Sequence, residues 1–310
     1  MKPTRSDETV AEERAEFRGA ILAAGLLVAT GVDGLYQRSG KFERVVRAVE
    51  ALASRSAGDK GGSQYYFSPI MAREAFERTD YLRSFPDLMG AIEVFQGGDD
   101  EHARLLRAAD QGQEWSQYLT LAEVALCSAA CHPLYSSLTG TLPAGGGNFE
   151  VQGYCFRHEP SLDPVRMQSF RQHEFVYVGE PDVALQHRDR WLDRGLDLLS
   201  GLGLDVQAEE ANDPFFGRAG RMLAANQRAT ALKYEITCPV SSSEVRTAIT
   251  SANCHESHFG DSFGIFTADG KPAHSACIGF GLERITLALI KRHGVDPASW
   301  PSEVRGKLWP

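Results

Sequence analysis

Arginines and glutamates gather in residues 149–174, where the sequence pattern predicts a β-hairpin with chemistry on it. The first arm is rich in aromatic and β-branched residues and the second alternates with period two, while the Pro, Ser and Asp of 158–164 are typical of a loop. On the second arm Glu174 lies on the face that the alternation predicts to be buried. Arg157 and Arg166 stand where the arms meet the loop. Guanidinium groups in this arrangement suit a polyanion lying across the hairpin.

A second run, residues 277–284, reads Cys-Ile-Gly-Phe-Gly-Leu-Glu-Arg and precedes an apolar helical pattern. It is not a dinucleotide fingerprint, because Arg284 stands where the third glycine would be. Glycines at alternate strand positions, Gly279 and Gly281, let a flat ring lie on the backbone, and an arginine at a helix start can reach a phosphate. A tight packing turn from strand to helix is the alternative interpretation.

These two runs resemble motifs 2 and 3 of the class II aminoacyl-tRNA synthetases, with Arg157-x-Glu159, a loop and Arg166-x-x-x-Phe170-x-x-x-Glu174 matching motif 2. The resemblance implies that Arg157 grips the α-phosphate of ATP and that Arg284 lies over adenine and the γ-phosphate, which makes both catalytic. The ATP-binding residues that it implies are Arg157, Glu159, Arg166, Met167, Phe170, Ala248, Thr250, Ser251, Gly281 and Arg284. Motif 1, which builds the dimer interface of the family, resembles the helix, loop, strand and proline of 41–69.

The first glycine of motif 3 is replaced by Cys277. Cys131, Glu174 and Cys277 lie far apart in the chain, so local spacing cannot reveal a metal site. The set resembles the Cys-Glu-Cys zinc site of the atypical, archaeal-type seryl-tRNA synthetases, where zinc binds the amino group of the substrate. Two thiolates and one carboxylate would leave the fourth position of Zn²⁺ open. The alternative is that both cysteines are core thiols.

Lys233 and Glu235 share one face of a predicted strand, and they are expected either to line the amino-acid pocket with Glu174 or to form a solvent-exposed ion pair. Residues 248–253 correspond to the segment that lines the ATP and magnesium site of seryl-type enzymes. Thr247 stands where those enzymes carry the magnesium carboxylate, which leaves Glu159 as a substitute.

Composition agrees with an ordinary globular protein of 310 residues, of which 43% are hydrophobic and 24% charged. The net charge of −9 argues against binding that depends on broad phosphate neutralisation. Six cysteines without a Cys-x-x-Cys pair, and no secretory signal, predict reduced thiols in the cytoplasm. The apolar run 20–29 is too short to span a bilayer, so we expect a soluble protein without a membrane partner.

The pattern predicts an antiparallel α+β domain of the class II synthetase type, flanked by helices and spanning 1–310, with a helical N-terminal part of about 1–60. Predicted helices cover 11–28, 41–54, 99–113, 120–131, 182–202, 213–226 and 282–293. Predicted strands cover 64–68, 204–209, 231–240 and 248–252, and 262–267 is expected to pair with 275–279.

The resemblance is closest to the amino acid:[carrier protein] ligases, truncated homologues of the atypical seryl enzymes that load glycine or alanine onto the phosphopantetheine thiol of a small acidic carrier protein. The implied partners are ATP with Mg²⁺, a small amino acid, the carrier protein and a second subunit. A basic helix of about 213–228 is expected to contact the carrier protein, although a solvated face is the alternative; its cations are Arg218, Arg221 and Arg228. A tRNA-charging enzyme is disfavoured because no RNA-binding domain is evident, and a non-catalytic paralogue because both motif arginines are present.

Overall fold

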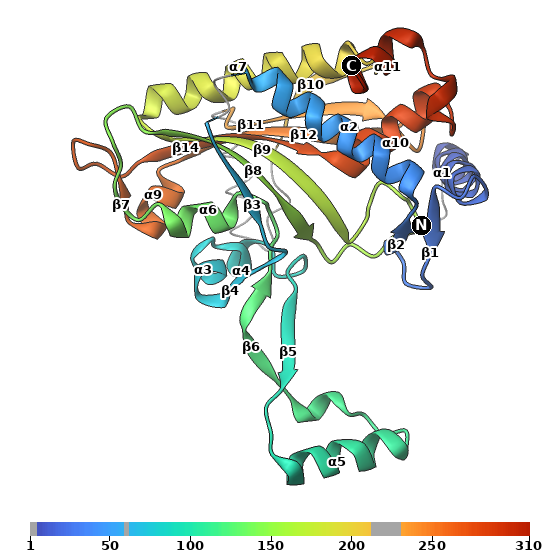
Figure 1. Cartoon of the computed structure of the whole chain (residues 1–310), viewed down its shortest axis with the longest axis vertical. Helices are drawn as coiled ribbons and strands as arrows, with labels where there is room; N and C mark the ends of the chain where they lie inside the picture. The colour runs from blue at the N-terminus through green and yellow to red at the C-terminus, as the bar shows by residue number, and fades with distance from the viewer. Residues whose placement is uncertain (1–4, 59–61, 212–230) are drawn as a thin grey trace.

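A seven-stranded sheet forms the centre of the protein in a computed structural model that describes residues 5–58, 62–211 and 231–310 (Figure 1). All neighbouring strands are antiparallel except β3 and β8, which are parallel. In sheet order the strands are β10 (Gln207–Glu210), β11 (Lys233–Pro239), β12 (Arg246–Glu256), β14 (His274–Gly281), β9 (Ser169–Gly179), β8 (Gly147–Phe156) and β3 (Ser63–Phe67).

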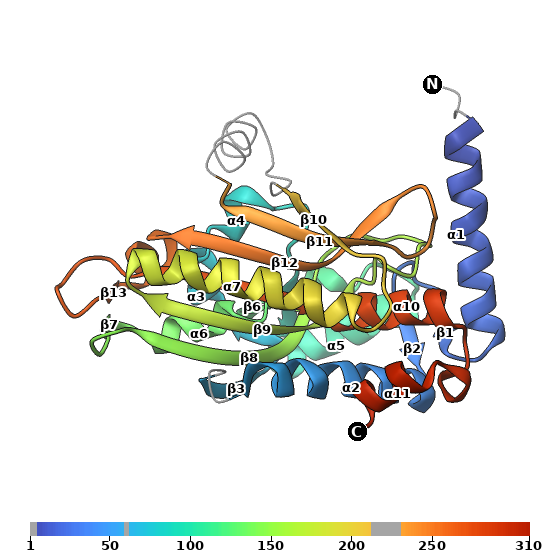
Figure 2. The same cartoon turned by 90° about the horizontal axis from the view of Figure 1, so that it is seen from above.

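Helices cover both faces of this sheet and bury a separate hydrophobic core on each side. Long helices lie on one face, namely α2 (Gly40–Ala57), α7 (Pro181–Ser200) and α10 (Leu282–His293), as Figures 1 and 2 show. Short helices lie on the other, namely α3 (Arg73–Arg78), α4 (Tyr81–Ser84), α6 (His132–Ser137) and α9 (His258–Phe263). The short helices leave part of their face of the sheet to the site described below.

Three further groups of elements complete the described chain. The N-terminal group is α1 (Arg5–Ala23), β1 (Leu27–Ala29) and β2 (Tyr36–Arg38), and the C-terminal pair is η3 (Pro297–Ser299) and α11 (Ser302–Leu308). An arm projects from the body in Figure 1 and consists of β5 (Ala91–Phe95), α5 (Asp99–Asp110), η2 (Ser116–Tyr118) and β6 (Leu119–Leu126), with β4 (Ile70–Ala72) pairing at its base. Two short strands, β7 (Gly140–Thr141) and β13 (Ile265–Phe266), pair in parallel. Among the described helices none is long and apolar enough to cross a membrane.

The antiparallel α+β architecture is confirmed, as are the helices predicted at 41–54, 182–202 and 282–293. The helix predicted at 120–131 is wrong, because residues 119–126 form strand β6 between β4 and β5. Apolar residues in this short run satisfy the helical spacing by chance, and pairing on both edges overrides it. Consequently Cys131 does not follow a helix but occupies the N-cap position of α6, without a side-chain capping bond.

Two other predictions need correction. The helix predicted over 11–28 ends at Ala23, since Gly25 adopts φ 63° and the chain then enters strand β1. The strand pair predicted between 262–267 and 275–279 does not form, because helix α9 occupies the start of the first segment and β14 pairs with β12 and β9. The predicted carrier-contact helix of about 213–228 lies outside the described residues.

A buried ion-pair network joins the sheet to the helices that cover it. The carboxylate of Glu283 accepts hydrogen bonds from Arg38 Nη1 and Arg171 Nε, each at 2.8 Å, and from the Arg171 backbone nitrogen at 2.7 Å. Arg171 also donates two bonds of 2.8 Å to Glu43 on α2. Thus Glu283 of the 277–284 run ties α10 to β9 and to the β1–β2 hairpin.

Replacing Glu283 by alanine is expected to lower the free energy of unfolding by about 3–5 kcal/mol, because Arg38 and Arg171, whose side chains are only 17% and 15% exposed, then lose a shared buried carboxylate. Urea denaturation measures the change. The matched control is Glu303→Ala, whose side chain is 79% exposed in its pair with Lys307 and is expected to cost under ~1 kcal/mol. Equal losses for the two variants would contradict a structural role for the Glu283 network.

Candidate active site

Two rows of polar residues run across neighbouring strands on one face of the sheet. Directly paired residues share a face, so the register of the strands defines the rows. The first row is Lys233, Asn253 and Cys277. The second is Glu235, Ser251, Gly279 and Glu174. Period-two alternation therefore brings together residues from β11, β12, β14 and β9 that lie far apart in the sequence.

Glycine at the centre of the second row leaves room for its neighbour. A Cβ atom on Gly279 would lie 3.4 Å from Cγ of Glu174. One step along the strand, a Cβ on Gly281 would lie 3.2 Å from the Ile249 carbonyl oxygen. At both glycines a Cβ would meet atoms of the protein itself, and the close approach of a ligand to this backbone stays a prediction.

Thr250 is the predicted site residue that the structure places elsewhere. It pairs with Ile236 and Phe280, both fully buried core residues of the opposite face, and it is itself 3% exposed. Since adjacent strand residues point to opposite faces, Ser251 faces the site and Thr250 does not. Its side chain therefore contributes nothing to the candidate site.

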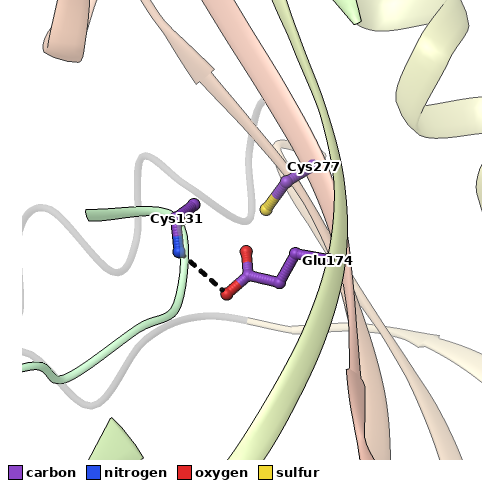
Figure 3. Close-up of side chains that lie close together, drawn as sticks. All are labelled: Cys131, Glu174 and Cys277. Atoms are coloured by element: carbon purple, nitrogen blue, oxygen red, sulfur yellow. Dashed lines mark hydrogen bonds between the residues drawn. The ribbon is translucent and has the colours of Figure 1, made fainter. Parts of the chain in front are cut away.

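Cys131, Glu174 and Cys277 converge at the end of this face (Figure 3). Their ligand atoms, two thiol sulfurs and a carboxylate oxygen, all lie within 4.8 Å of one another, and all three side chains are buried. The turn before α6 holds Glu174 in place, since the backbone nitrogens of Ala130 and Cys131 donate to its Oε1 at 3.0 and 3.3 Å.

The cluster is electrostatically unusual for a group of neutral core side chains. The Cys131 thiol donates toward Cys277, which raises the pKa of Cys131 and lowers that of Cys277. Burial, with Cys277 nearby, raises the pKa of Glu174 to about 8. Three buried groups that can each become anionic suit a divalent cation, which would replace their protons. Two thiolates and one carboxylate are donors that Zn²⁺ accepts, so the residues present fit this metal.

Two residues beside this cluster escaped the sequence-based prediction. Asn253 Nδ2 and His255 Nε2 lie 3.7 and 3.8 Å from the Cys277 sulfur. Both share with Ser251 the face of β12 that points to the site, so extending the period-two alternation by four residues would have found them. Tyr135 on α6 is also fully buried near the cluster, beside Cys131 and Cys277.

Three arginines form the second part of the site. Arg284 donates from Nε to the Val165 carbonyl and from Nη1 to the Ala248 carbonyl, each at 2.9 Å. Burial, together with the positive charges of Arg157 and Arg166, lowers the pKa of Arg284 to about 10, so Arg284 remains protonated at neutral pH. Cations held this close to one another favour an anionic ligand.

Around these arginines lie the remaining predicted nucleotide residues. A small cavity is lined by Pro164, Val165, Met167, Phe170, Gly281, Glu283 and Arg284, four of which the motifs predicted. The Arg157 guanidinium lies 5.5 Å from the centre of the Phe170 ring, and its Nε donates to the Ser128 carbonyl at 3.3 Å. Glu159 accepts a bond of 2.9 Å from Arg166.

Lys233 and Glu235 form an ion pair, with 3.2 Å between Nζ and Oε1. The pair is not solvent-exposed, because the Lys233 side chain is only 10% accessible. Both residues lie on the face that carries Ser251 and Glu174. The interpretation that places them in the amino-acid pocket requires this arrangement. The geometry agrees with a place at the substrate pocket.

Comparison with known proteins points to the same class of enzyme as the motifs do. No protein-family profile matches the chain. Two Bradyrhizobium diazoefficiens proteins, named amino acid–[acyl-carrier-protein] ligase 1 and 2, are each 40% identical over 289 residues, which is 93% of this chain and 88% and 86% of theirs. The chain belongs to this ligase family. It is an enzyme of the aminoacyl-tRNA synthetase type, as its motifs predicted.

More distant relatives and solved structures agree with this assignment. A type-2 serine–tRNA ligase of Methanococcus maripaludis is 25% identical over 295 residues, covering 89% of this ligase and 56% of its own length. The crystal structure of M. kandleri SerRS with A. aeolicus tRNASec superposes with TM-score 0.81 at 20% identity, over 95% of this chain and 60% of the other. Seryl-tRNA synthetase from Pyrococcus horikoshii, complexed with ATP, gives 0.68 at 13% identity, over 95% and 62%. The predicted class II synthetase fold is thereby confirmed.

Proposed function

We propose that this ligase activates glycine or alanine with ATP and transfers the aminoacyl group to the phosphopantetheine thiol of a small acidic carrier protein. The observation that carries the proposal is the convergence on one sheet face of a three-ligand cluster and of three arginines. One part can hold an amino acid and the other a polyphosphate. The B. diazoefficiens relatives are named for a reaction that needs both.

In the first step a carboxylate oxygen of the amino acid attacks the α-phosphorus of ATP and pyrophosphate leaves. Arg157 would bind the α-phosphate, and Arg284 the adenine and γ-phosphate, so that charge developing in the transition state meets fixed cations. The Ala248–Ser251 strand segment, Met167, Phe170 and Gly281 would surround the base and ribose. No side chain need act as a nucleophile, because orientation and charge neutralisation supply the rate.

Cys131, Glu174 and Cys277 would hold Zn²⁺, and the metal would supply a Lewis acid for the amino group of the substrate. Lys233 and Glu235 would line the pocket beside it. Mg²⁺ would accompany ATP, with Glu159 as its candidate carboxylate in place of the residue lost at Thr247. In the structure Glu159 is paired with Arg166, so the ion would compete with that guanidinium for the carboxylate.

In the second step the phosphopantetheine sulfur attacks the carbonyl carbon of the adenylate, and AMP leaves. A small acidic carrier protein needs a basic surface, for which the candidates are Arg218, Arg221 and Arg228, in the sequence between β10 and β11. A homodimer is proposed through β3, an edge strand whose Tyr66 is 70% exposed.

Amino-acid-dependent exchange of pyrophosphate into ATP tests the first step. We expect exchange with one or two small amino acids among the twenty, and loss of exchange after zinc chelation, because the amino group then loses its ligand. Restoring Zn²⁺ to the chelated protein is the control. Exchange that does not depend on zinc would contradict the metal site, and no exchange with any amino acid would favour a non-catalytic binding paralogue.

The acceptor is then identified with the same labelled amino acid. We expect label on a carrier protein bearing phosphopantetheine and none on the same carrier protein without it. Labelling of tRNA instead would favour the alternative, a tRNA-charging seryl-type enzyme.

A further inference from the structure

The N-terminal helix α1 docks its first half through charged residues. The side of α1 that faces the body carries Val10, Glu13, Arg14, Phe17, Arg18 and Ile21, of which only Phe17 and Ile21 are fully buried apolar residues. A helix that serves stability alone usually presents an apolar stripe along its length. The charged residues in the first half of α1 are therefore explained by their contacts rather than by apolar packing.

Arg14 reaches the loop that carries the nucleotide residues. Its Nε lies 3.1 Å from Oδ2 of Asp163, a carboxylate that is only 6% exposed. The same Asp163 oxygen accepts a bond of 3.0 Å from Ser241, while its other oxygen accepts one of 3.2 Å from the Val165 nitrogen. Asp163 thus joins α1, the segment before β12 and the 157–168 loop.

Glu13, next to Arg14, holds the segment before β12. Its carboxylate accepts bonds from the backbone nitrogen of Ser243 at 2.7 Å and from the Ser243 hydroxyl at 2.6 Å. Adjacent residues of one helix therefore contact two loops that are distant in the sequence, and these contacts add to the Ser241–Asp163 bond that joins the loops directly.

The β1–β2 hairpin holds the 157–168 loop from a second side. Tyr36 accepts a bond from Arg18 of α1 and donates to the Leu162 carbonyl, each at 3.2 Å. Gln168 donates from its backbone to the Gly34 carbonyl at 2.9 Å and from its side chain to the Asp33 carbonyl at 2.7 Å. The loop is consequently anchored at its middle and at its end by N-terminal residues.

These contacts bear on Arg284, because the two segments that α1 grips are also those that hold its guanidinium. Val165 belongs to the 157–168 loop, and Ala248 belongs to β12, which begins three residues after Ser243. Their carbonyl oxygens accept both of the bonds by which Arg284 is oriented. A change in the separation of the loops would move one acceptor relative to the other.

We propose that α1 is a positioning element for the nucleotide, in which Glu13 and Arg14 set the separation of the two loops that hold Arg284 and line the cavity. The inference rests on the proposed ATP-dependent function. We call the contacts of Glu13 and Arg14 with the two loops the clamp. Without the clamp the loops would be correctly placed for only a fraction of the time, and the apparent affinity for ATP would fall in proportion to that fraction. Once ATP is bound the loops are in place, so the rate at saturation changes little.

The test measures pyrophosphate exchange by Glu13→Ala, Arg14→Ala and the double variant. We expect KM for ATP to rise about tenfold in the double variant, if the loops are in place about a tenth of the time, while kcat and KM for the amino acid stay within about twofold. Arg14→Lys, which keeps the charge, is expected to recover part of the affinity. The matched control is Glu16→Ala, which removes a carboxylate from the exposed face of the same helix and should leave every constant unchanged.

Four outcomes would overturn the inference or separate it from the proposed function. An unchanged KM for ATP would overturn it, and so would a fall in kcat and thermal midpoint without a change in KM, which would give α1 a structural role only. If the unaltered protein shows no exchange, the proposed function fails, and calorimetric titration with ATP then tests the clamp directly. Equal ATP affinity of the unaltered protein and the double variant would overturn the inference in that case as well.

Discussion

Replacing Arg157 by alanine is expected to lower kcat/KM for amino-acid-dependent pyrophosphate exchange about 100- to 1,000-fold. One preorganised donor to charge that develops in the transition state contributes on the order of 2.7–4 kcal/mol to catalysis. Arg157 fits this role because its guanidinium is oriented by the Phe170 ring and by the Ser128 carbonyl. The loss should fall mainly on kcat, since Arg284 and Arg166 still attract the triphosphate.

Lysine at the same position separates charge from geometry. Arg157→Lys keeps a cation but loses the planar pair of donors, so we expect it to recover only part of the rate. His158→Ala, at the exposed neighbouring position, is the control and should stay within about twofold of the unaltered enzyme, as surface substitutions usually do. If Arg157→Ala raised KM for ATP and left kcat unchanged, Arg157 would be a binding residue only.

Period-two alternation explains why so much of the site was predictable from the sequence. Once 169–179 and 274–281 are recognised as strands, alternation assigns Glu174, Cys277 and Gly279 to faces without any coordinates. The same rule argues against Thr250, which was taken from the family pattern together with its neighbour Ser251. At Thr250 the family pattern and the alternation of strand residues disagree, and the structure follows the alternation.

Sequence periodicity fails where tertiary pairing decides the element. Residues 119–126 fit a helical spacing, but they form the middle strand of a three-stranded sheet, and only the presence of β4 and β5 on either side determines that outcome. The clustering of Cys131 with Cys277 has the same origin. It depends on the register of β9 against β14 and on the turn before α6, and the spacing of residues along the sequence predicts neither.

The six cysteines show most clearly what the sequence alone cannot predict, because the side chains are identical and only their surroundings in the fold differ. Burial raises the pKa of Cys127 and of Cys238 to about 11, as expected for core thiols, whereas the pKa of Cys277 is lowered by its neighbours, first by Cys131. A thiol that is stabilised as thiolate in a buried site is a candidate metal ligand. The distinction leads to the second prediction of large effect.

Replacing Cys131 or Cys277 by alanine is expected to remove the bound zinc and to abolish amino-acid activation. Losing one of three protein ligands should weaken zinc binding more than a hundredfold, since losing even a supporting contact to a ligand costs about 10–100-fold. Elemental analysis of the purified protein measures the metal, and exchange kinetics measure the activity. Asn253→Ala, which removes a group 3.7 Å from the Cys277 sulfur, is expected to retain part of both.

Cys238→Ala is the matched control, because Cys238 is equally buried but lies in the core under the long helices, away from Glu174. It should lose stability by about 1 kcal/mol, as a small core truncation does, and keep its zinc and its exchange activity. If all three cysteine variants instead lost similar stability and none changed its metal content, Cys131 and Cys277 would be core thiols. Glu174 would then be a buried carboxyl group that holds a proton at neutral pH, as its pKa of about 8 allows. The amino group of the substrate would need another partner on this face. Glu235, the other carboxylate in the same row, is the candidate.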